Sequence, residues 1–445
     1  MRAFRTPDLR KKLLFTGAMI VLFRFGSNLP APGISEQNVS YCSRMSSSSG
    51  VFAILNLFSG NSLLHLTVFA IGILPYITAS IIVQMLTQVI PRLETLRKDG
   101  QAGQAKITQY TRYVTVGLGL VYAVVYVQAA RTGAAFPGSG CGPAFHPLIP
   151  DPTPVTIATM VITMVSGTAV IMWMGELITD RGVGIGMSVL MFTSIMAVIP
   201  GEIGQIYIVK RFFYAAAAVL VIIAVTTLIV FIEQGQRRIP VQYAKRITGR
   251  PAAAGGQVSK VYGGGSTFIP VKVNQAGVVP VIFASSLVEM PQLAVSVLGN
   301  QHQPQGWVTW IERNLDPALL VAPYVYFLAF FGLILGFTFF YVSITFNPDE
   351  LSDNIRKHGG FVPGIRPGTP TSAHLRYVLS RLTAPGSIYL ALVAMLPLVA
   401  LDKIGLGQDL QLSGISLLIM VGVGLDTVKQ IHSQLEQHSY EGFLR

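Results

Sequence analysis

The chain offers few side chains that could do chemistry. Its seven histidines are scattered, and we find no phosphate-binding loop, no zinc-spaced set of histidines and cysteines and no nucleophile elbow. Ion-coupled transporters keep ionisable residues in the membrane, where a central charge costs about 2.5–3.5 kcal/mol on insertion scales. Here Arg24 is the only charge well inside an apolar run, and pairing with a neighbouring carbonyl accounts for it. The sequence therefore predicts no catalysis, no cofactor and no metal.

Branched apolar side chains occupy the places where a transporter would carry ionisable groups. Ile73 and Ile77 lie one helical turn apart, and Ile282 is the counterpart of Ile77 in a second copy of the same segment. A ring of such side chains in a pore excludes water and ions by dewetting but yields to a large substrate. The alternative is that these are ordinary packed or lipid-facing isoleucines.

These isoleucines belong to a segment that occurs twice. GILPYITASIIVQM at 72–85 returns 205 residues later as GVVPVIFASSLVEM at 277–290, with seven of fourteen positions identical. Each copy opens with Gly-x-x-Pro, which bends or breaks a helix. Matched breaks in two halves point to the working site of a repeat-built membrane protein.

Composition places the chain in a membrane. Hydrophobic residues make up 51% and charged residues 12%, about half the charge of a soluble protein. A helix needs about 20 mostly apolar residues to span a bilayer. Ten runs satisfy this, at about 13–30, 72–90, 110–130, 155–177, 184–200, 211–232, 273–290, 321–346, 385–401 and 412–428.

The distribution of Lys and Arg predicts the topology. With the N-terminus in the cytoplasm, cytoplasmic segments hold 25 of the 32 Lys and Arg residues. Ten helices divide into two sets of five, and the helix that opens with the repeated Gly-x-x-Pro is second in each set. Because five is odd, the second set enters the membrane with opposite polarity, so the halves form an inverted repeat.

A polar interruption precedes the expected helix at 72–90, which carries the first copy of the repeat. Residues 51–70 are apolar but contain Ser59-Gly60-Asn61-Ser62, so they are unsuited to span. Irregular backbone at membrane depth must be buried in protein or line a cavity. We expect a half-helix that folds back into a cavity; the alternative is an amphipathic helix on the external surface.

Two cytoplasmic loops, 233–272 and 347–383, are longer than a connection requires. Both are basic, and their turns suggest docking surfaces that protrude from the membrane, in addition to contacts with anionic lipids. Cys42 and Cys141 fall in external loops, where either one disulfide or two unpaired thiols are compatible with the sequence.

Six motifs, in this order along the chain, resemble those of the SecY family, the channel subunits of protein translocases. They are GILPYITASIIVQML, KITQYTRY, QYAKRITGR, NQAGVVPVIFASS, GGFVPGIRPG and the terminal SYEGFLR. The resemblance implies an all-α polytopic membrane protein with ten transmembrane helices in two inverted five-helix halves and a re-entrant half-helix plug. It also implies a lateral gate between the second and third helices on one side and the seventh and eighth on the other.

The resemblance also implies functional residues. The pore ring falls on Ile73, Ile77, Met187, Met191, Ile282 and Ile419, where two methionines replace the more familiar isoleucines of the fifth helix. The plug maps to about 56–70, including Asn56, Ser59, Gly60, Asn61 and Leu64. The gate is expected to include Ser80, Gln84, Ser285 and Glu289. Docking of a motor or ribosome is expected at Arg237, Arg238, Lys245, Arg246, Arg250, Arg366 and Tyr440.

The sequence therefore predicts a passive, gated polypeptide channel of a prokaryotic plasma membrane, with both termini cytoplasmic. The resemblance implies as partners SecE, SecG, the SecA motor ATPase, the ribosome, signal peptides and nascent polypeptides. The rival functions are a secondary transporter, which requires a polar midplane, and a structural scaffold. The expected organisation is an N-terminal half at 1–200, a sixth helix and first loop at 201–272, the rest of the C-terminal half at 273–430, and a tail at 431–445.

Overall fold

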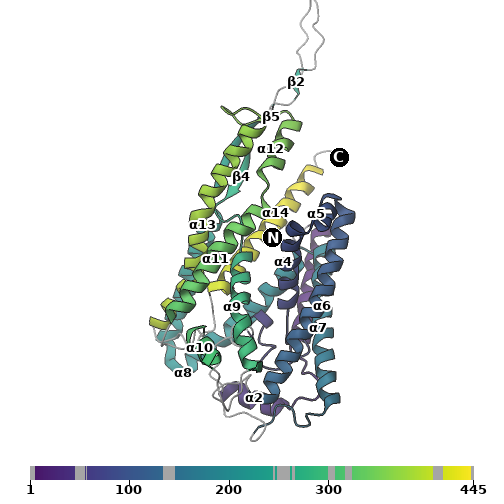
Figure 1. Cartoon of the computed structure of the whole chain (residues 1–445), viewed down its shortest axis with the longest axis vertical. Helices are drawn as coiled ribbons and strands as arrows, with labels where there is room; N and C mark the ends of the chain where they lie inside the picture. Colours follow the sequence, from purple (N-terminus) through teal and green to yellow (C-terminus); the bar gives the residue numbers. More distant parts are fainter. Residues whose placement is uncertain are drawn as a thin grey trace, which may run out of the picture.

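Long helices dominate the computed structural model of the chain (Figure 1). The described residues are 6–45, 56, 58–133, 146–243, 246–247, 261–262, 266–298, 306–315, 323–403 and 414–441. The helices are α1 (Pro7–Gly26), α2 (Glu36–Met45), α4 (Leu74–Val89), α5 (Pro91–Lys98), α6 (Gln101–Thr132), α7 (Pro154–Arg181), α8 (Gly186–Glu233), α9 (Val279–Leu298), α10 (Gly306–Leu315), α11 (Pro323–Thr345), α12 (Pro348–Lys357), α13 (Thr369–Lys403) and α14 (Gly414–Glu441). The strands are β1 (Gln236–Tyr243), β2 (Arg246–Ile247), β3 (Val261–Tyr262), β4 (Ser266–Lys272) and β5 (Gly360–Phe361).

Each predicted membrane span falls on a helix. The spans correspond to α1, α4, α6, α7, two parts of α8, α9, α11, α13 and α14. Within the described ranges, seven helical segments are long and apolar enough to cross a membrane, or eight if α4 is joined with α5 across a bend of 101°. The chain is therefore a helical protein that crosses the membrane several times.

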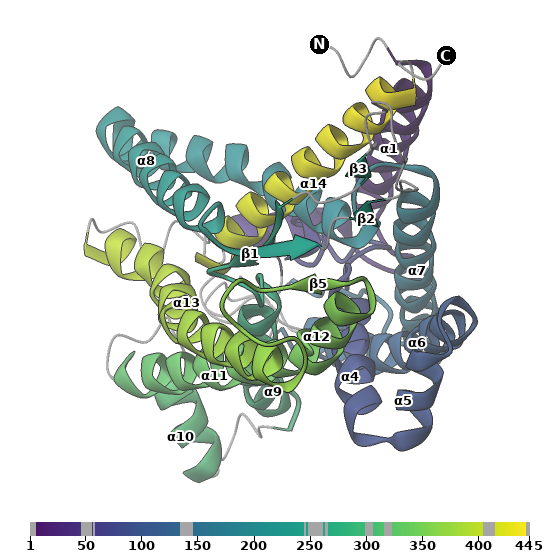
Figure 2. The ribbon, with the colours of Figure 1, turned by 90° about the horizontal axis from the view of Figure 1, so that it is seen from above.

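The fifth and sixth predicted spans are parts of one continuous helix. We expected separate helices at 184–200 and 211–232, but α8 runs from Gly186 to Glu233 with Pro200 inside it. Figure 2 shows α8 as two arms of a V. The helical assignment continues through the connection between the arms, GEIGQIYIVK, although Gly186–Ile208 and Phe212–Glu233 are each long and apolar enough to be a separate span.

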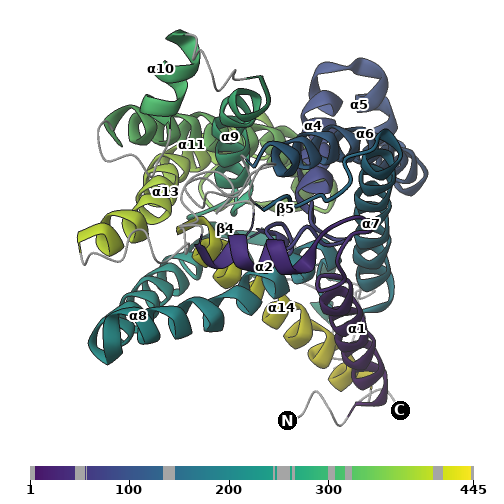
Figure 3. The same cartoon turned by 90° about the horizontal axis from the view of Figure 1, so that it is seen from below.

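The helices pack as two groups that meet along two junctions. In the first group α6 packs on α4 and α7, and in the second α11 packs on α9 and α13. One junction is made by α8 against α13 and α14, and the other by α9 against α4 and α6 (Figure 3). The second junction brings together the two helices that begin with the repeated break.

The two breaks have the same backbone geometry. Gly72 and Gly277 both adopt φ of 64°, and the helix begins two residues later in each copy. In each copy two successive amides donate to one carbonyl oxygen, at 3.1 and 3.2 Å for Ile73 and at 3.2 and 3.2 Å for Val278. The sequence repeat is therefore also a structural repeat. Glycine is needed at both positions because residues with a Cβ rarely adopt this φ.

A small sheet, absent from the expected fold, lies at the end of the molecule that also carries α12. Its strand order is β4-β1-β5, and all pairs are antiparallel. Ile239 and Val241 alternate with exposed residues along β1, which is the period of a half-buried strand. They join a second apolar core that includes Val271, Ile355, Val362, Leu375 and Val378. The described strands of the long loops thus pack onto the helix ends.

The two glycines form a matched pair for a stability measurement. A Cβ on Gly72 would lie 3.2 Å from the Cα of Ser59, whereas a Cβ on Gly277 would meet nothing within 4 Å. We expect Gly277→Ala to destabilise the protein by about 1–2 kcal/mol through the left-handed backbone alone, and Gly72→Ala by more. Thermal unfolding of the purified protein in detergent measures both, and equal shifts would contradict the crowding at Gly72.

Candidate functional site

The plug segment, which we define as residues 56 and 58–70, is helical only at its start. Residues 58 and 59 are helical, and turns follow from Gly60 onward. Among the described residues the expected half-helix is thus present at 56, 58 and 59, and turns replace it from Gly60 onward. The reason is local, because Gly60, Asn61 and Leu66 have φ of 69°, 72° and 48°. A right-handed helix cannot continue through left-handed residues.

Buried polar side chains hold these turns together. The Oδ1 of Asn56 accepts from the amide of Leu64 at 3.2 Å, and its Nδ2 donates to Oδ1 of Asn61 at 2.8 Å. The Oγ of Ser59 accepts from the amide of Leu63 at 3.0 Å. Because a buried amide without a partner costs about 1–3 kcal/mol, these side chains allow irregular backbone to remain in an apolar setting.

The plug segment is also tied to the residues that follow α1. The amide of Val68 donates to Leu29 O at 2.9 Å, and the amide of Ala31 donates to Leu66 O at 3.1 Å. The Oγ of Ser62 donates to the carbonyl oxygen of Ser27 at 3.2 Å. The segment is therefore held at one edge by strand-like bonds and can be displaced only by breaking them.

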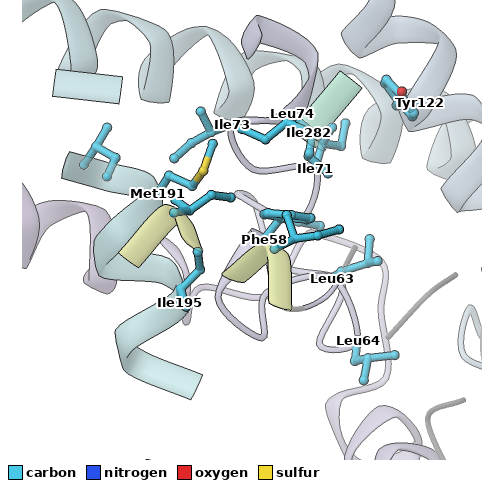
Figure 4. Close-up of a cluster of buried hydrophobic side chains, with 14 of the residues drawn as sticks. Phe58, Leu63, Leu64, Ile71, Ile73, Leu74, Tyr122, Met191, Ile195 and Ile282 are labelled. Carbon is cyan, nitrogen blue, oxygen red and sulfur yellow. The ribbon is translucent and has the colours of Figure 1, made fainter. Parts of the chain in front are cut away.

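The residues expected to form a pore ring gather in one apolar cluster. Ile73, Met187, Met191, Ile282 and Ile419 are each less than 9% exposed. Ile77 is half-buried and packs against the same cluster. Figure 4 shows Ile73, Met191 and Ile282 above Phe58 and Leu63 of the plug segment. Four separate parts of the chain thus contribute to a centre that excludes water.

The two methionines of this cluster come from the first turns of α8. Met187 packs so closely on α7 that a Cβ on Gly175 would lie 2.0 Å from its Sδ. A Cβ on Gly186 would lie 1.9 Å from the carbonyl oxygen of Gly175. These glycines therefore allow the close packing of α7 on α8, which brings two flexible thioethers into the cluster.

The expected gate residues lie on α4 and α9. Ser80 is half-buried and accepts from Nε2 of the exposed Gln84 at 3.4 Å, and Ser285 is buried. The Oγ of Ser285 donates to the carbonyl oxygen of Ile282 at 2.9 Å. Each hydroxyl or amide contacts its own helix, so no polar bond among the described residues crosses this junction at these positions. The side chain of Glu289 lies outside the described residues.

An ion pair that the sequence reasoning missed links α6 to α7. Arg112 makes two bonds to Glu176, from Nε to Oε1 at 2.8 Å and from Nη2 to Oε2 at 2.7 Å. This two-point geometry is the strong form of an arginine–carboxylate pair. Its only sequence signal was the presence of opposite charges on two consecutive helices, and it ties α6 to α7.

Two of the expected docking surfaces are exposed. Arg237 and Arg238 lie on β1, and the Cζ of Arg238 stands 4.7 Å from the ring centroid of Phe268. Arg366 is exposed in a turn between Gly364 and Gly368, which both have positive φ. Lys245 and Arg250 lie outside the described residues, as do the side chains of Arg246 and Tyr440.

Two further expectations concern single residues. Arg24 donates from Nη1 to the carbonyl oxygen of Gly60 at 3.2 Å, so its predicted pairing with a carbonyl is confirmed. Cys42 is fully buried and disulfide-bonded, and the only other cysteine, Cys141, lies outside the described residues. In the described part of the chain, no group of three metal-ligating side chains occurs.

Comparison with known proteins was made by sequence and by structure. The family model described as SecY matches residues 67–428. A protein of Streptomyces scabiei named Protein translocase subunit SecY is 53% identical over 449 residues, covering 100% of this chain and 99% of that protein. The protein of the same name from Mycobacterium tuberculosis strain H37Rv is 51% identical over 454 residues, covering 100% and 98%.

Solved structures share the fold. A protein-conducting channel superposes with a TM-score of 0.64 at 17% identity, covering 95% of this chain and 92% of that one. Sec61 from a canine ribosome-channel complex superposes with a TM-score of 0.61 at 17% identity, with the same coverage. At these identities the structures establish the helical arrangement alone.

Proposed function

The chain belongs to the SecY family, and from this premise we propose how its residues gate a polypeptide channel. It is the pore-forming subunit of a protein translocase and not an enzyme. We infer that the apolar cluster is the closed constriction of the pore and that the plug segment seals it from one side. The observation that carries this proposal is that five of the six ring residues are buried in the apolar cluster that also holds Phe58 and Leu63, with Ile77 packed against it.

Opening requires separation along the junction of α9 with α4 and α6. The polar side chains at Ser80, Gln84 and Ser285 bond within their own helices, so separation breaks few polar bonds. An apolar signal segment that binds the separated state better than the closed state shifts the equilibrium by that difference in affinity. The same opening releases apolar helices sideways into lipid. Unfolded secretory chains pass through the ring, and partner proteins supply the energy.

A secondary transporter is the second candidate, because it also uses inverted repeats and broken helices. It requires polar or ionisable groups beside the breaks. The side chains beside these breaks are Ile73, Ile77 and Ile282, and five of the six ring positions are buried among other apolar residues. This favours a gate that excludes ions over a site that binds them.

The distribution of Lys and Arg supports a proposal for the membrane orientation and the partners of the channel. We infer a bacterial plasma membrane, with both termini in the cytoplasm, where most Lys and Arg residues then fall. SecE and SecG are the expected small subunits, and anionic lipids the expected neighbours of the basic segments. The exposed Arg237, Arg238 and Arg366 provide a surface for SecA or the ribosome. Canine Sec61 and yeast Ssh1, which share the fold, occur in complexes with ribosomes.

Crosslinking to a stalled secretory chain tests the function directly. Cysteine introduced by Ile77→Cys or Ile282→Cys should crosslink to the chain in membranes that contain the purified complex, because both positions border the cluster. Ile223 is 60% exposed on α8 and provides the control position, where we expect no crosslink. Absence of crosslinks at 77 and 282, together with uptake of small molecules by the same vesicles, would favour a transporter.

Polar substitution in the ring tests the seal. We expect Ile77→Ser and Ile282→Ser to raise the resting ion conductance severalfold and to relax the selection of signal sequences, because a hydroxyl stabilises water in the constriction. Ile223→Ser, at an exposed position, should leave the conductance unchanged. Planar-bilayer recordings measure this, and unchanged conductance in both ring variants would rule out the assigned constriction.

Substitution of Arg366 tests the docking surface. This side chain stands on a turn that Gly364 and Gly368 hold in a defined shape, so it can offer a guanidinium to a carboxylate or phosphate of a partner. We expect Arg366→Ala to reduce translocation driven by SecA severalfold without changing resting conductance. Lys357→Ala removes an equally exposed charge nearby and serves as the control. Equal losses in the two variants would indicate a general charge effect.

A further inference from the structure

Arg24 lies in the last turn of α1 and makes its side-chain contact with the plug segment. Its Nη1 donates to the carbonyl oxygen of Gly60 at 3.2 Å, across 36 residues of sequence. Within the described ranges no carboxylate forms an ion pair with it. A charge inside a membrane helix is costly and is usually retained for function. The hydrogen bond from Arg24 to the carbonyl oxygen of Gly60 is therefore a candidate for a functional contact.

Gly60 occupies a narrow place between two helices. A Cβ there would lie 3.1 Å from Nη1 of Arg24 and 3.2 Å from both Cα and Cβ of Ser194 on α8. Its φ of 69° also favours glycine. Ser194 is fully buried and follows Met191 of the ring by one helical turn. The turn at Gly60 is therefore held between the end of α1 and the wall of the apolar cluster.

We propose that Arg24 is a latch that holds the plug segment in the closed position. This inference rests on the proposed function of the segment as a plug and adds a positioning residue outside it. The hydrogen bonds of Asn56 and Ser59 stay within the segment and move with it. The bond from Arg24 breaks when the segment leaves, as do the bonds at its edge, and among these it is the one with a charged donor. Breaking it leaves a half-buried guanidinium without this acceptor.

The latch also couples opening to the presence of substrate. A polypeptide that enters the pore carries main-chain carbonyl groups of the same chemistry as that of Gly60. Such a carbonyl can accept from Arg24 once the plug segment has moved, so the open state is favoured more when a chain is present than when the pore is empty. Arg24 would thereby oppose spontaneous opening without opposing translocation.

Neutralisation of Arg24 tests the latch. In vesicles containing the complete complex without substrate, we expect Arg24→Gln to raise resting ion conductance roughly tenfold, because a bond from a charged donor is lost. The reaction of a soluble thiol reagent with Leu63→Cys, at a position 5% exposed in the closed state, should accelerate by a similar factor. Arg131→Gln, in the exposed last turn of α6, should change neither quantity.

A second pair of variants separates the latch from a purely local role. Arg24 also lies at the C-terminus of α1, where any cation interacts favourably with the helix dipole. Arg24→Lys keeps that cation but shortens its reach, so the latch predicts a smaller rise in conductance and a dipole role predicts none. Gly60→Ala acts on the other partner of the contact, so its effect on resting conductance should not add to that of Arg24→Gln. Additive increases in conductance would show that the two residues do not act through one contact.

Removal of the plug segment distinguishes failure of the latch from failure of the plug. Deletion of residues 58–66 should make the resting channel leak. If this deletion leaks and Arg24→Gln changes neither conductance nor thiol labelling, the latch is wrong and the plug stands. If neither protein leaks, the assignment of the segment as a plug is itself wrong, and the latch with it.

Discussion

Backbone that leaves the helix at membrane depth must satisfy its own hydrogen bonds, and the rest of this structure depends on how that is done. Between α1 and α4 the chain makes a series of turns within a protein whose outer surface faces lipid. Asn56 and Ser59 provide acceptors for backbone amides inside these turns. At the edge of these turns the carbonyl oxygens of Leu29 and Leu66 accept hydrogen bonds from the amides of Val68 and Ala31. Irregular backbone is thereby stable next to an apolar constriction.

The two helices that begin with a break lie beside this irregular backbone and contribute to the proposed gate. Both breaks use glycine at the same φ, and both place an isoleucine side chain in or against one cluster. The ring positions themselves carry only isoleucine and methionine side chains, which offer no ligands to an ion. The six ring positions come from the separate helices α4, α8, α9 and α14 and from the residue that precedes α4, which is what the proposed opening by helix separation requires.

The polar contacts are distributed unevenly around the cluster. The Arg112–Glu176 pair joins α6 to α7 within one group of helices, whereas the junction of α9 with α4 and α6 has no such pair among the described residues. The continuous helix α8 links the two groups on the other side. Separation of α9 from α4 and α6 therefore breaks no ion pair among the described residues, whereas separation on the other side is constrained by α8. Arg24 adds a contact from a charged side chain to the bonds that already tie the plug segment to the residues after α1.

The sequence alone determined the spans, the repeat and the apolar character of the site, because these depend on composition and on patterns within one helix. It also indicated that residues such as Ile73 and Ile282 belong together, since they lie beside matched breaks. It did not reveal the turns of the plug segment, the sheet built on β1 or the continuity of α8. Only the tertiary structure decided which groups meet across long separations, as Arg24 meets Gly60 and Arg112 meets Glu176. Such contacts depend on how helices pack, and no local pattern in the chain encodes that packing.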